Sequence, residues 1–353
     1  MPYEGTYHSQ PAPRQFERRG TDFADQRDAM VARFIKFLET SLFILILFHF
    51  SGATNGILFP PTEDGLVEES ATARLLWFPV YGLILILLLK NMMHFIRLSI
   101  LNPVLIICVL WSGISYFWSI DPSLTMRRSV ALLMTTVMGL VFAARYDWNG
   151  MIQRLAFAFF IMAIVAFLFT IINPDQGIMK VIHPGAWSGP WGEKNYLGGQ
   201  MTKGLIACLC AFAMQPKRIW LWGPACLLCF TLVLLSTSKT ALLISLFSIL
   251  SFTAIWLFRK FPLIRFPLLY LVLAAFITFG VLMATIPDDM LGLIGKDTTF
   301  TGRTDIWNEL VRAVKQKPWL GYGYGTFWDD QLGPSYTLRS ICLLYTSPSP
   351  RDA

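Results

Sequence analysis

The sequence predicts an all-α, polytopic transmembrane protein, and its composition carries most of this prediction. Of 353 residues, 55% are hydrophobic and only 14% are charged, and the mean hydropathy is +0.54. Soluble domains are less apolar than this. The apolar residues gather in about nine runs, each near the length of about 20 residues that a helix needs to cross a bilayer. A polar segment follows the ninth run, and we expect it to be an extracytoplasmic loop.

The transmembrane helical scaffold is expected over residues 31–286. Residues 1–30 are rich in Pro, Gln, Arg and Asp without a sustained apolar period, so we expect a disordered cytoplasmic tail. Residues 287–340 are expected to begin a large periplasmic loop. The predicted spans are Phe34–Phe50, Leu75–Lys90, Leu101–Trp118, Val130–Ala144, Ile152–Ile172, Leu197–Met214, Ile219–Leu235, Ala241–Phe258 and Leu268–Ile286.

Basic residues predict the orientation of these spans. They fall on alternate connections, at Lys90, Arg97, Arg145, Arg154, Lys217, Arg218, Arg259, Lys260 and Arg265. This is also the side of the basic tail, and the positive-inside bias places it in the cytoplasm. The amino terminus is therefore expected to be cytoplasmic. The net charge of +7 then reflects topology, and no nucleic-acid partner is expected.

The outward connection before the sixth span offers a candidate anion site. Lys194 and Asn195 lie where the next helix is expected to begin, and an ammonium group beside free backbone N–H groups attracts anions. Trp191 lies just before them, as a candidate substrate contact and as an anchor at the lipid headgroups. An interfacial loop with a snorkelling lysine explains the same residues equally well.

Two further basic groups lie on connections expected to face outward. Arg127 and Arg128 oppose the positive-inside bias, and a bound lipid phosphate would explain them. A pair of arginines that snorkels to headgroups, or that pairs with Asp121, explains them equally well. Lys239 lies among hydroxyl side chains at the outer junction of two spans, which favours an anion contact over snorkelling.

The polar segment after the ninth span holds the candidate catalytic residue. Arg303 begins an expected amphipathic helix, and a guanidinium group can hold a diphosphate through two parallel hydrogen bonds. Gly321 and Gly323 follow this helix and alternate with aromatic residues. Glycine permits close backbone approach and aromatic rings can face sugars, so both are candidate substrate-binding positions.

No metal site and no cofactor are expected. A metal-dependent lipid-linked glycosyltransferase needs clustered outward carboxylates, often as Asp-x-Asp, and the sequence has no such pair. The cysteines with short spacing lie inside apolar runs without a nearby histidine or carboxylate, so we interpret them as packing residues. Cations are therefore the expected partners of a diphosphate.

Five motifs occur in order between the first span and Phe327. They are Trp111-Ser112 with Trp118-Ser119-Ile120-Asp121-Pro122 and Arg127-Arg128; Trp187-Ser188-Gly189 with Glu193-Lys194-Asn195; Ser236-Thr237-Ser238-Lys239-Thr240; Gly302-Arg303-Thr304 with Trp307; and Pro318-Trp319-Leu320-Gly321-Tyr322-Gly323. Together they resemble the O-antigen ligase and Wzy-type polymerase family, and within it the exopolysaccharide-production polymerases.

The resemblance implies an enzyme of the bacterial inner (cytoplasmic) membrane with multiple spans. Members of the family transfer glycan from undecaprenyl diphosphate to a sugar hydroxyl, generally without a metal ion. The implied partners are an undecaprenyl-diphosphate-linked oligosaccharide, a glycan acceptor, the lipid bilayer and other polysaccharide-export proteins. By this analogy Arg303 is the first choice for the diphosphate contact, and Lys194, Lys239, Arg127 and Arg128 are weaker choices.

The end of the chain departs from the family pattern. Members carry a His-Asn motif further along the periplasmic loop and then about three more spans, whereas no histidine follows His183 here. Residues 341–353 have an abrupt Ser/Pro composition typical of translated adapter sequence, and we expect them to be non-native. The chain is then expected to lack the base and the closing helices, and to be inactive as it stands.

A membrane transporter or flippase for a lipid-linked or anionic substrate is the alternative function. For that class, outward cations would form a binding site. A transporter should also carry ionisable groups in the middle of its spans. We interpret the charges here as lying at span ends, which favours the enzyme. A structural membrane subunit is a third and weaker possibility.

Overall fold

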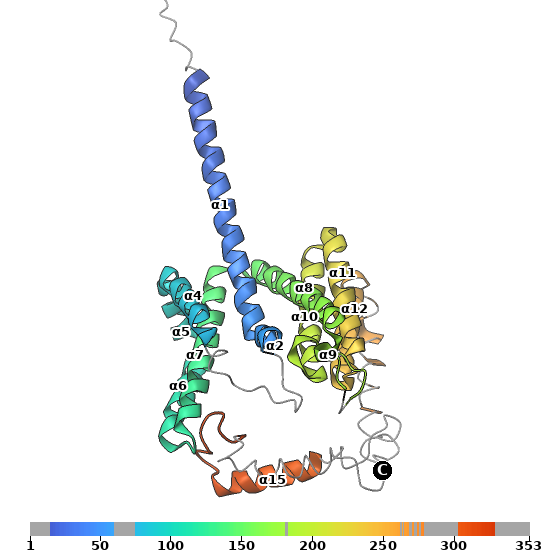
Figure 1. The fold of residues 1–353 in the computed structure, drawn as a ribbon. Helices are drawn as coiled ribbons and strands as arrows, with labels where there is room; N and C mark the ends of the chain where they lie inside the picture. Colours follow the sequence, from blue (N-terminus) through green and yellow to red (C-terminus); the bar gives the residue numbers. More distant parts are fainter. Residues whose placement is uncertain are drawn as a thin grey trace, which may run out of the picture.

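The computed structural model describes residues 15–59, 75–180, 183–261 and 303–328, with scattered positions between 263 and 278. This part of the chain is helical, apart from its connections and an isolated antiparallel bridge between Ile178 and Trp187. Its helices are α1 (Gln15–Phe50), α2 (Ala53–Leu58), α4 (Trp77–Lys90), α5 (Met92–Leu101), α6 (Pro103–Ile114), η1 (Ser115–Trp118), α7 (Pro122–Arg145), α8 (Trp148–Ile172), α9 (Pro174–Gly177), η2 (Gly189–Trp191), α10 (Lys194–Met214), η3 (Pro216–Arg218), α11 (Ile219–Leu235), α12 (Lys239–Lys260) and α15 (Arg303–Gln316). Figure 1 shows a bundle with α15 lying across its lower end.

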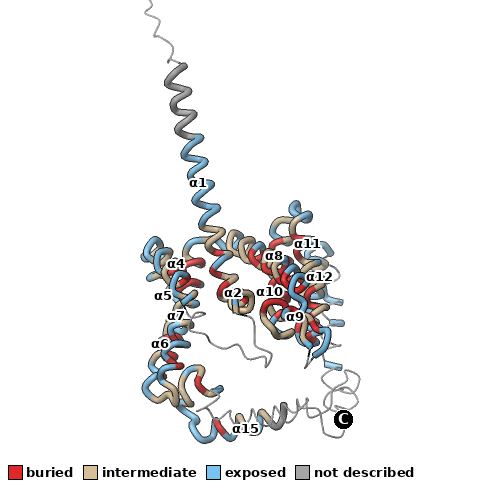
Figure 2. The backbone as a smooth tube through the Cα atoms, viewed as in Figure 1, coloured by how far each residue is buried: buried red, intermediate tan, exposed pale blue. Residues whose placement is uncertain are grey.

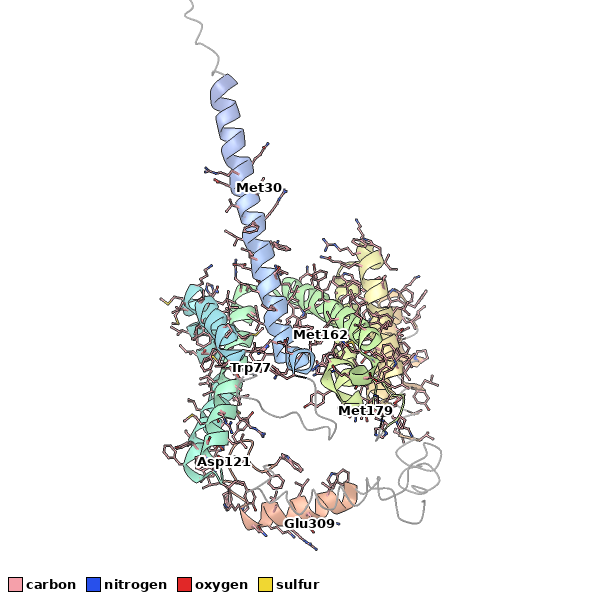
Figure 3. All side chains as sticks on the ribbon, viewed as in Figure 1. Met30, Trp77, Asp121, Met162, Met179 and Glu309 are labelled. Carbon is pink, nitrogen blue, oxygen red and sulfur yellow. The ribbon has the colours of Figure 1, made fainter. Side chains whose placement is uncertain are left out.

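Helix α1 differs from the expected tail. It begins at Gln15, so residues 15–30 are helical where we expected disorder. Good helix formers follow the last proline of the tail, and adding residues to an existing helix costs far less than starting one. The apolar half of α1 therefore extends into the polar segment. Met30 is 70% exposed, and the helix around it stands clear of the bundle (Figures 2 and 3).

The carboxyl-terminal half of α1 packs against α4 and α7. Phe43 and Ile46 of α1, Ile84 of α4 and Val141 of α7 are buried in one apolar cluster. The ring of Phe43 meets that of Phe142 edge to face, with centroids 4.0 Å apart. This cluster attaches α1 to the α4–α7 side of the molecule.

The densest core lies between α8, α10, α11 and α12. Met162, Leu197, Met201 and Val233 are buried there at 2% exposure or less, and Figure 2 shows buried segments concentrated in these helices. At Gly204 an added Cβ would lie 3.1 Å from the sulfur of a cysteine on α11, so the absent side chain lets α10 and α11 approach closely.

The number of spans is lower than expected in the described residues. Five helices there are long and apolar enough to cross a membrane, namely α7, α8, α10, η3 with α11, and α12. The α4–α5 pair, bent by 90°, makes a sixth if it is one broken span. The expected count of nine is not confirmed. The predicted span Leu268–Ile286 lies mostly outside the described residues.

Two other expected spans do not qualify as membrane-crossing helices, one because of its length and one because of its charges. The predicted span Leu101–Trp118 is a shorter apolar helix, α6 continued by η1. The last 18 residues of α1 are apolar but include Arg33, Lys36 and Glu39, too many charges for a clear span.

The two ends of the bundle differ in what they carry. Helices α7, α10 and α12 begin at the same end, here called the site end, which is the lower end in Figure 1. Asp121, Met179 and Glu309 lie toward it in Figure 3. The other end, here called the opposite end, carries the α7–α8 turn and the start of α11. Nearly all candidate residues lie on elements of the site end.

Candidate functional site

The turn between α6 and α7 holds the first candidate residues. Helix α7 begins at Pro122, earlier than the predicted span start at Val130. Asp121 caps it, because its Oδ1 accepts a 3.0 Å hydrogen bond from a backbone N–H of the first turn, and proline suits the first helical position. Arg127 and Arg128, expected on an outward loop, therefore lie in the first two turns of α7.

The glycine loop, residues 317–328, docks on this turn. Five hydrogen bonds join them: Trp118 Nε1 to Leu320 O (2.7 Å), Ile120 N to Tyr322 O (3.1 Å), Tyr324 N to Ser115 Oγ (2.9 Å), Thr125 Oγ1 to Tyr324 O (3.4 Å), and Arg128 Nη1 to Gly325 O. Partners in these bonds are up to 209 residues apart in sequence. The structure thus unites the first and the last of the five motifs.

Gly323 makes this docking possible. Its φ is +99°, and an added Cβ would lie 2.3 Å from Ser119 Oγ and 2.8 Å from Ser119 Cα. Gly321 also has a positive φ, +66°, but no atom lies within 4 Å of the position of its Cβ. Of the two glycines predicted to bind substrate, Gly323 is therefore occupied by a contact within the protein, whereas Gly321 is open.

The glycine loop also grips α15. The hydroxyl of Tyr322 donates to Ala313 O at 2.9 Å, within α15. Thr326 is fully buried, and its Oγ1 donates to Tyr322 O at 2.6 Å. One loop therefore connects α15 to the α6–α7 turn, so the position of α15 depends on both contacts.

The arginine pair at this turn keeps part of its hydrogen-bonding capacity. One N–H of Arg128 is used on Gly325 O, but a guanidinium carries five donors. Both Arg127 and Arg128 are exposed. An anion at the surface of the turn can reach them while the loop stays docked.

The second group of candidates lies where α10 and α12 begin. Glu193 caps α10 through a 2.9 Å hydrogen bond from Tyr196 N to its Oε2. Asn195 donates to Glu193 Oε1 at 2.6 Å and accepts a hydrogen bond from Ser238 Oγ at 2.8 Å. Since Ser238 caps α12, Asn195 ties the starts of two helices together, and we call this junction the α10–α12 corner.

The corner brings two predicted cations to adjacent helix starts. Lys194 is the first residue of α10 and is half-buried, and Lys239 is the first residue of α12 and is exposed. Free backbone N–H groups and the helix dipole add positive potential at both starts. Trp191, predicted to contact the substrate, instead donates its Nε1–H to Ser51 O at 2.7 Å and so holds the end of α1.

A groove of about 260 Å³ runs along α10 from this corner. It is lined by Glu193, Asn195, Tyr196, Gly199, Gln200 and Lys203. Lys203 is the tenth residue of the 21-residue helix, about 13 Å from its start, and it is exposed. The interpretation that charges lie only at span ends is therefore wrong.

Sequence reasoning missed Lys203 for a simple reason. The run Leu197–Met214 is apolar enough as a whole to predict a span, and its average hydropathy hides the lysine inside it. An ionisable residue in the middle of a span is expensive and usually faces a polar cavity. That position alone could have identified it.

Helix α15 carries the candidate catalytic residue at its start. Arg303 is its first residue, and its side chain lies outside the described set. Figure 1 shows α15 along the site end, with its carboxyl-terminal end leading to the glycine loop and its amino-terminal end toward the side of α10 and α12. A helix of 14 residues spans about 21 Å.

The side chains at the site end suit an anion better than a metal ion. Among the residues that the structure describes, no three His, Cys, Asp or Glu side chains lie together as a metal site would need. The carboxylates of Asp121 and Glu193 are both used in capping helices. The absence of a metal ion and of a cofactor stays a prediction.

Comparison with known proteins finds that the chain is similar to O-antigen ligases and to an exopolysaccharide production protein. Residues 224–341 match a family model described as O-antigen ligase. The chain is also 29% identical over 230 residues to the exopolysaccharide production protein ExoQ of Rhizobium meliloti (strain 1021), covering 62% of this chain and 51% of that protein. The chain thus spans about half the length of this curated relative. No solved structure matches the chain significantly.

The family match covers only part of the candidate site. It includes Lys239, Arg303, Gly321 and Gly323 but not the α6–α7 turn or α10. The glycine loop inside the match nevertheless docks on the α6–α7 turn outside it. The resemblance found in the sequence motifs is confirmed by both comparisons.

Proposed function

We propose, from the match of residues 224–341 to the O-antigen ligase family model and from the helices long and apolar enough to cross a membrane, that this chain acts in glycosyl transfer. The donor would be an undecaprenyl-diphosphate-linked oligosaccharide and the acceptor a sugar hydroxyl. The product would be a polymerised or ligated exopolysaccharide or O-antigen. The site end would face the periplasm of a bacterial inner membrane, with the amino terminus in the cytoplasm.

For this reaction the protein mainly has to position the two substrates and to supply cations. The acceptor oxygen attacks the anomeric carbon, the bond from that carbon to the diphosphate oxygen breaks, and the acceptor proton passes to a base. Undecaprenyl diphosphate leaves with the bonding electrons. Cations that meet the growing negative charge lower the barrier, and each well-placed donor contributes about 100-fold or more in rate.

One observation supports this proposal above the others: helices α7, α10 and α12 begin at the same end, each with a cation in its first two turns. These are Arg127 and Arg128, Lys194, and Lys239. Helix α15, which begins at Arg303, lies across that end (Figure 1). Helix starts and cations together favour a diphosphate.

Lys203 adds a contact that the sequence-based site did not include. It lines the groove along α10 and lies about 13 Å along the helix from its start at the corner. A lysine at that depth can contact a lipid-linked diphosphate that enters the groove from the headgroup region. We propose Lys203 and Arg303 as the two cations that contact the diphosphate, with Lys194 and Lys239 at the entrance.

The test measures two quantities in membranes in which the wild type is first shown to lengthen the glycan. Conversion of lipid-linked oligosaccharide to longer glycan is read on gels, and binding of undecaprenyl diphosphate is measured separately. Lys203→Gln and Arg303→Gln are expected to lower conversion about 100-fold and to weaken binding. The matched control is Lys217→Gln at the opposite end. If both variants bind and convert like the control, this assignment is wrong.

A transporter or flippase is the second candidate, and Lys203 is the observation that favours it. A mid-span ionisable residue is typical of a translocation path. The two functions separate in proteoliposomes, because a transporter moves the lipid-linked oligosaccharide across the bilayer without lengthening it. Longer glycan without net translocation supports transfer, and the reverse result supports transport.

A further inference from the structure

A basic pocket lies at the opposite end of the bundle, away from the site just described. Its volume is about 570 Å³, and it lies between α1, the α7–α8 turn, the first turns of α8, and η3 with the start of α11. Helix α7, which connects the two ends, has 24 residues and is therefore about 36 Å long. The basic pocket is thus separate from the glycine loop and the α10–α12 corner.

Four cationic side chains from these elements line the basic pocket: Lys36, Arg145, Arg154 and Arg218. Its one carboxylate, Asp147, caps α8 by accepting a 3.2 Å hydrogen bond from Gly150 N. Like charges gathered in one pocket repel one another, so this arrangement costs free energy unless an anion offsets it.

Only one of the four cations has an acidic partner among the described residues. Arg145 Nη2 lies 3.0 and 3.2 Å from the two carboxylate oxygens of Glu39. Within that part of the chain, Lys36, Arg154 and Arg218 form no ion pair with a carboxylate. Four cations thus stand against two carboxylates, Asp147 and Glu39, so half of the positive charge of the basic pocket is not compensated by the protein.

Two buried donors that line the basic pocket have no acceptor. Arg154 Nε and Trp222 Nε1 are both inaccessible to solvent and form no hydrogen bond. Trp222 is only 2% exposed. Buried donors are nearly always satisfied, because an unpaired donor loses its hydrogen bonds to water without a replacement. Both donors belong to residues that line the basic pocket, so an acceptor that enters its wall would satisfy them.

The remaining lining fits an amphiphilic ligand. The guanidinium of Arg154 lies 3.9 Å from the centre of the Tyr146 ring, and burial raises the pKa of the Tyr146 hydroxyl, which therefore stays a neutral hydrogen-bonding group. Phe157 and Leu221 supply an apolar wall. A phosphate group would satisfy the cations, and an attached glycerol and acyl chain would find apolar surface beside it.

We propose that the basic pocket binds a phosphate group at the opposite end of the bundle, and that its ligand is a phosphomonoester or phosphodiester such as the headgroup of an anionic phospholipid. This site is independent of glycosyl transfer. Its role is to hold together α1, α7, α8 and η3, the four elements that each contribute one cation to the anion. Inorganic phosphate shares the chemistry, so the experiment separates the two sources.

The experiment measures thermal unfolding of the full chain in neutral detergent. Phosphatidylglycerol, phosphatidylcholine and inorganic phosphate are titrated separately. The charge variant is Lys36→Gln with Arg218→Gln, and Lys217→Gln is the matched control because it removes a neighbouring charge that does not line the basic pocket. A second variant, Trp222→Phe, removes only the orphan indole donor and keeps an aromatic ring.

Phosphatidylglycerol is expected to raise the unfolding temperature of the wild type, and phosphatidylcholine is not. Each removed cation should weaken the apparent lipid affinity about fivefold, and the double variant about 25-fold. The control should change it less than about twofold, and Trp222→Phe should also weaken it. A response to inorganic phosphate alone would identify a free anion as the ligand.

The proposal is overturned in either of two ways. One is a double variant that keeps the lipid response of the wild type. The other is a control variant that loses as much response as the double variant, because the effect is then general surface charge. If the double variant does not fold, an unchanged response of Trp222→Phe overturns the proposal in its place.

Discussion

Replacing Gly323 by alanine tests whether the docking of the glycine loop organises the site end. The new Cβ would lie 2.3 Å from Ser119 Oγ and 2.8 Å from Ser119 Cα. A backbone atom cannot move aside as a flexible side chain can, so the loop has to lift from the α6–α7 turn. Gly321→Ala is the matched control, since it has a positive φ but no neighbour within 4 Å of the added carbon.

The size of the effect follows from the bonds on either side of Gly323. The Ile120 N to Tyr322 O and Tyr324 N to Ser115 Oγ hydrogen bonds both break when the loop lifts, and each contributes about 1 kcal/mol net. Alanine at this φ adds about 1 kcal/mol of strain. The sum, about 3 kcal/mol, raises the population of the undocked loop about 100-fold. Gly321→Ala carries the strain alone and should raise it about fivefold.

Hydrogen exchange measured by mass spectrometry reads this population directly. Peptides that cover residues 317–328 are expected to exchange about 100-fold faster in Gly323→Ala, while peptides from α8 and α10 keep their protection. The unchanged peptides exclude general unfolding. Equal exchange in the two glycine variants would refute the argument, because it would mean that the contact with Ser119 does not require glycine.

Two further predictions concern stability. Gly198→Ala places a carbon 2.8 Å from the Cβ of Ala241 and should lower the free energy of unfolding by about 2 kcal/mol. Gly199→Ala has open space around the added carbon and should raise the free energy of unfolding by up to about 1 kcal/mol. Unfolding in detergent measures both changes. Lys180, 2.8 Å from Asp175 Oδ1, lowers the pKa of that carboxyl, so its contribution is present above the ordinary pKa of about 3.9 and disappears as pH falls. Thermal unfolding curves of wild type and Lys180→Met should differ slightly near neutral pH and converge in acid.

The sequence predicted helices well wherever composition alone decides them. The predicted span Ile219–Leu235 coincides with α11, and Ile152–Ile172 and Ala241–Phe258 lie within α8 and α12. The start of α7 was missed because its first two turns are polar and basic. Asp121 and Pro122 form a cap that a search for apolar runs does not detect.

The site was less predictable because its geometry depends on contacts between distant segments. Glycine and aromatic residues after Pro318 indicated close approach, but not that the partner is Ser119 rather than a sugar. Asn195 was predicted to bind substrate, and both ends of its amide are held by Glu193 and Ser238. Pattern reasoning identifies the chemistry of a residue, whereas its partner is set by packing.

The contact between the glycine loop and the α6–α7 turn gives Gly323 an indirect role in the proposed reaction. The loop holds α15 through Tyr322, and α15 begins at Arg303. If Gly323 acts by positioning Arg303, then Gly323→Ala should slow glycosyl transfer in the wild type but add little to Arg303→Gln, since residues that act as a unit are not additive. A double-mutant cycle on transfer rates measures this coupling. Independent, multiplying losses would show instead that Gly323 serves the reaction by another route, for example by contacting the glycan itself.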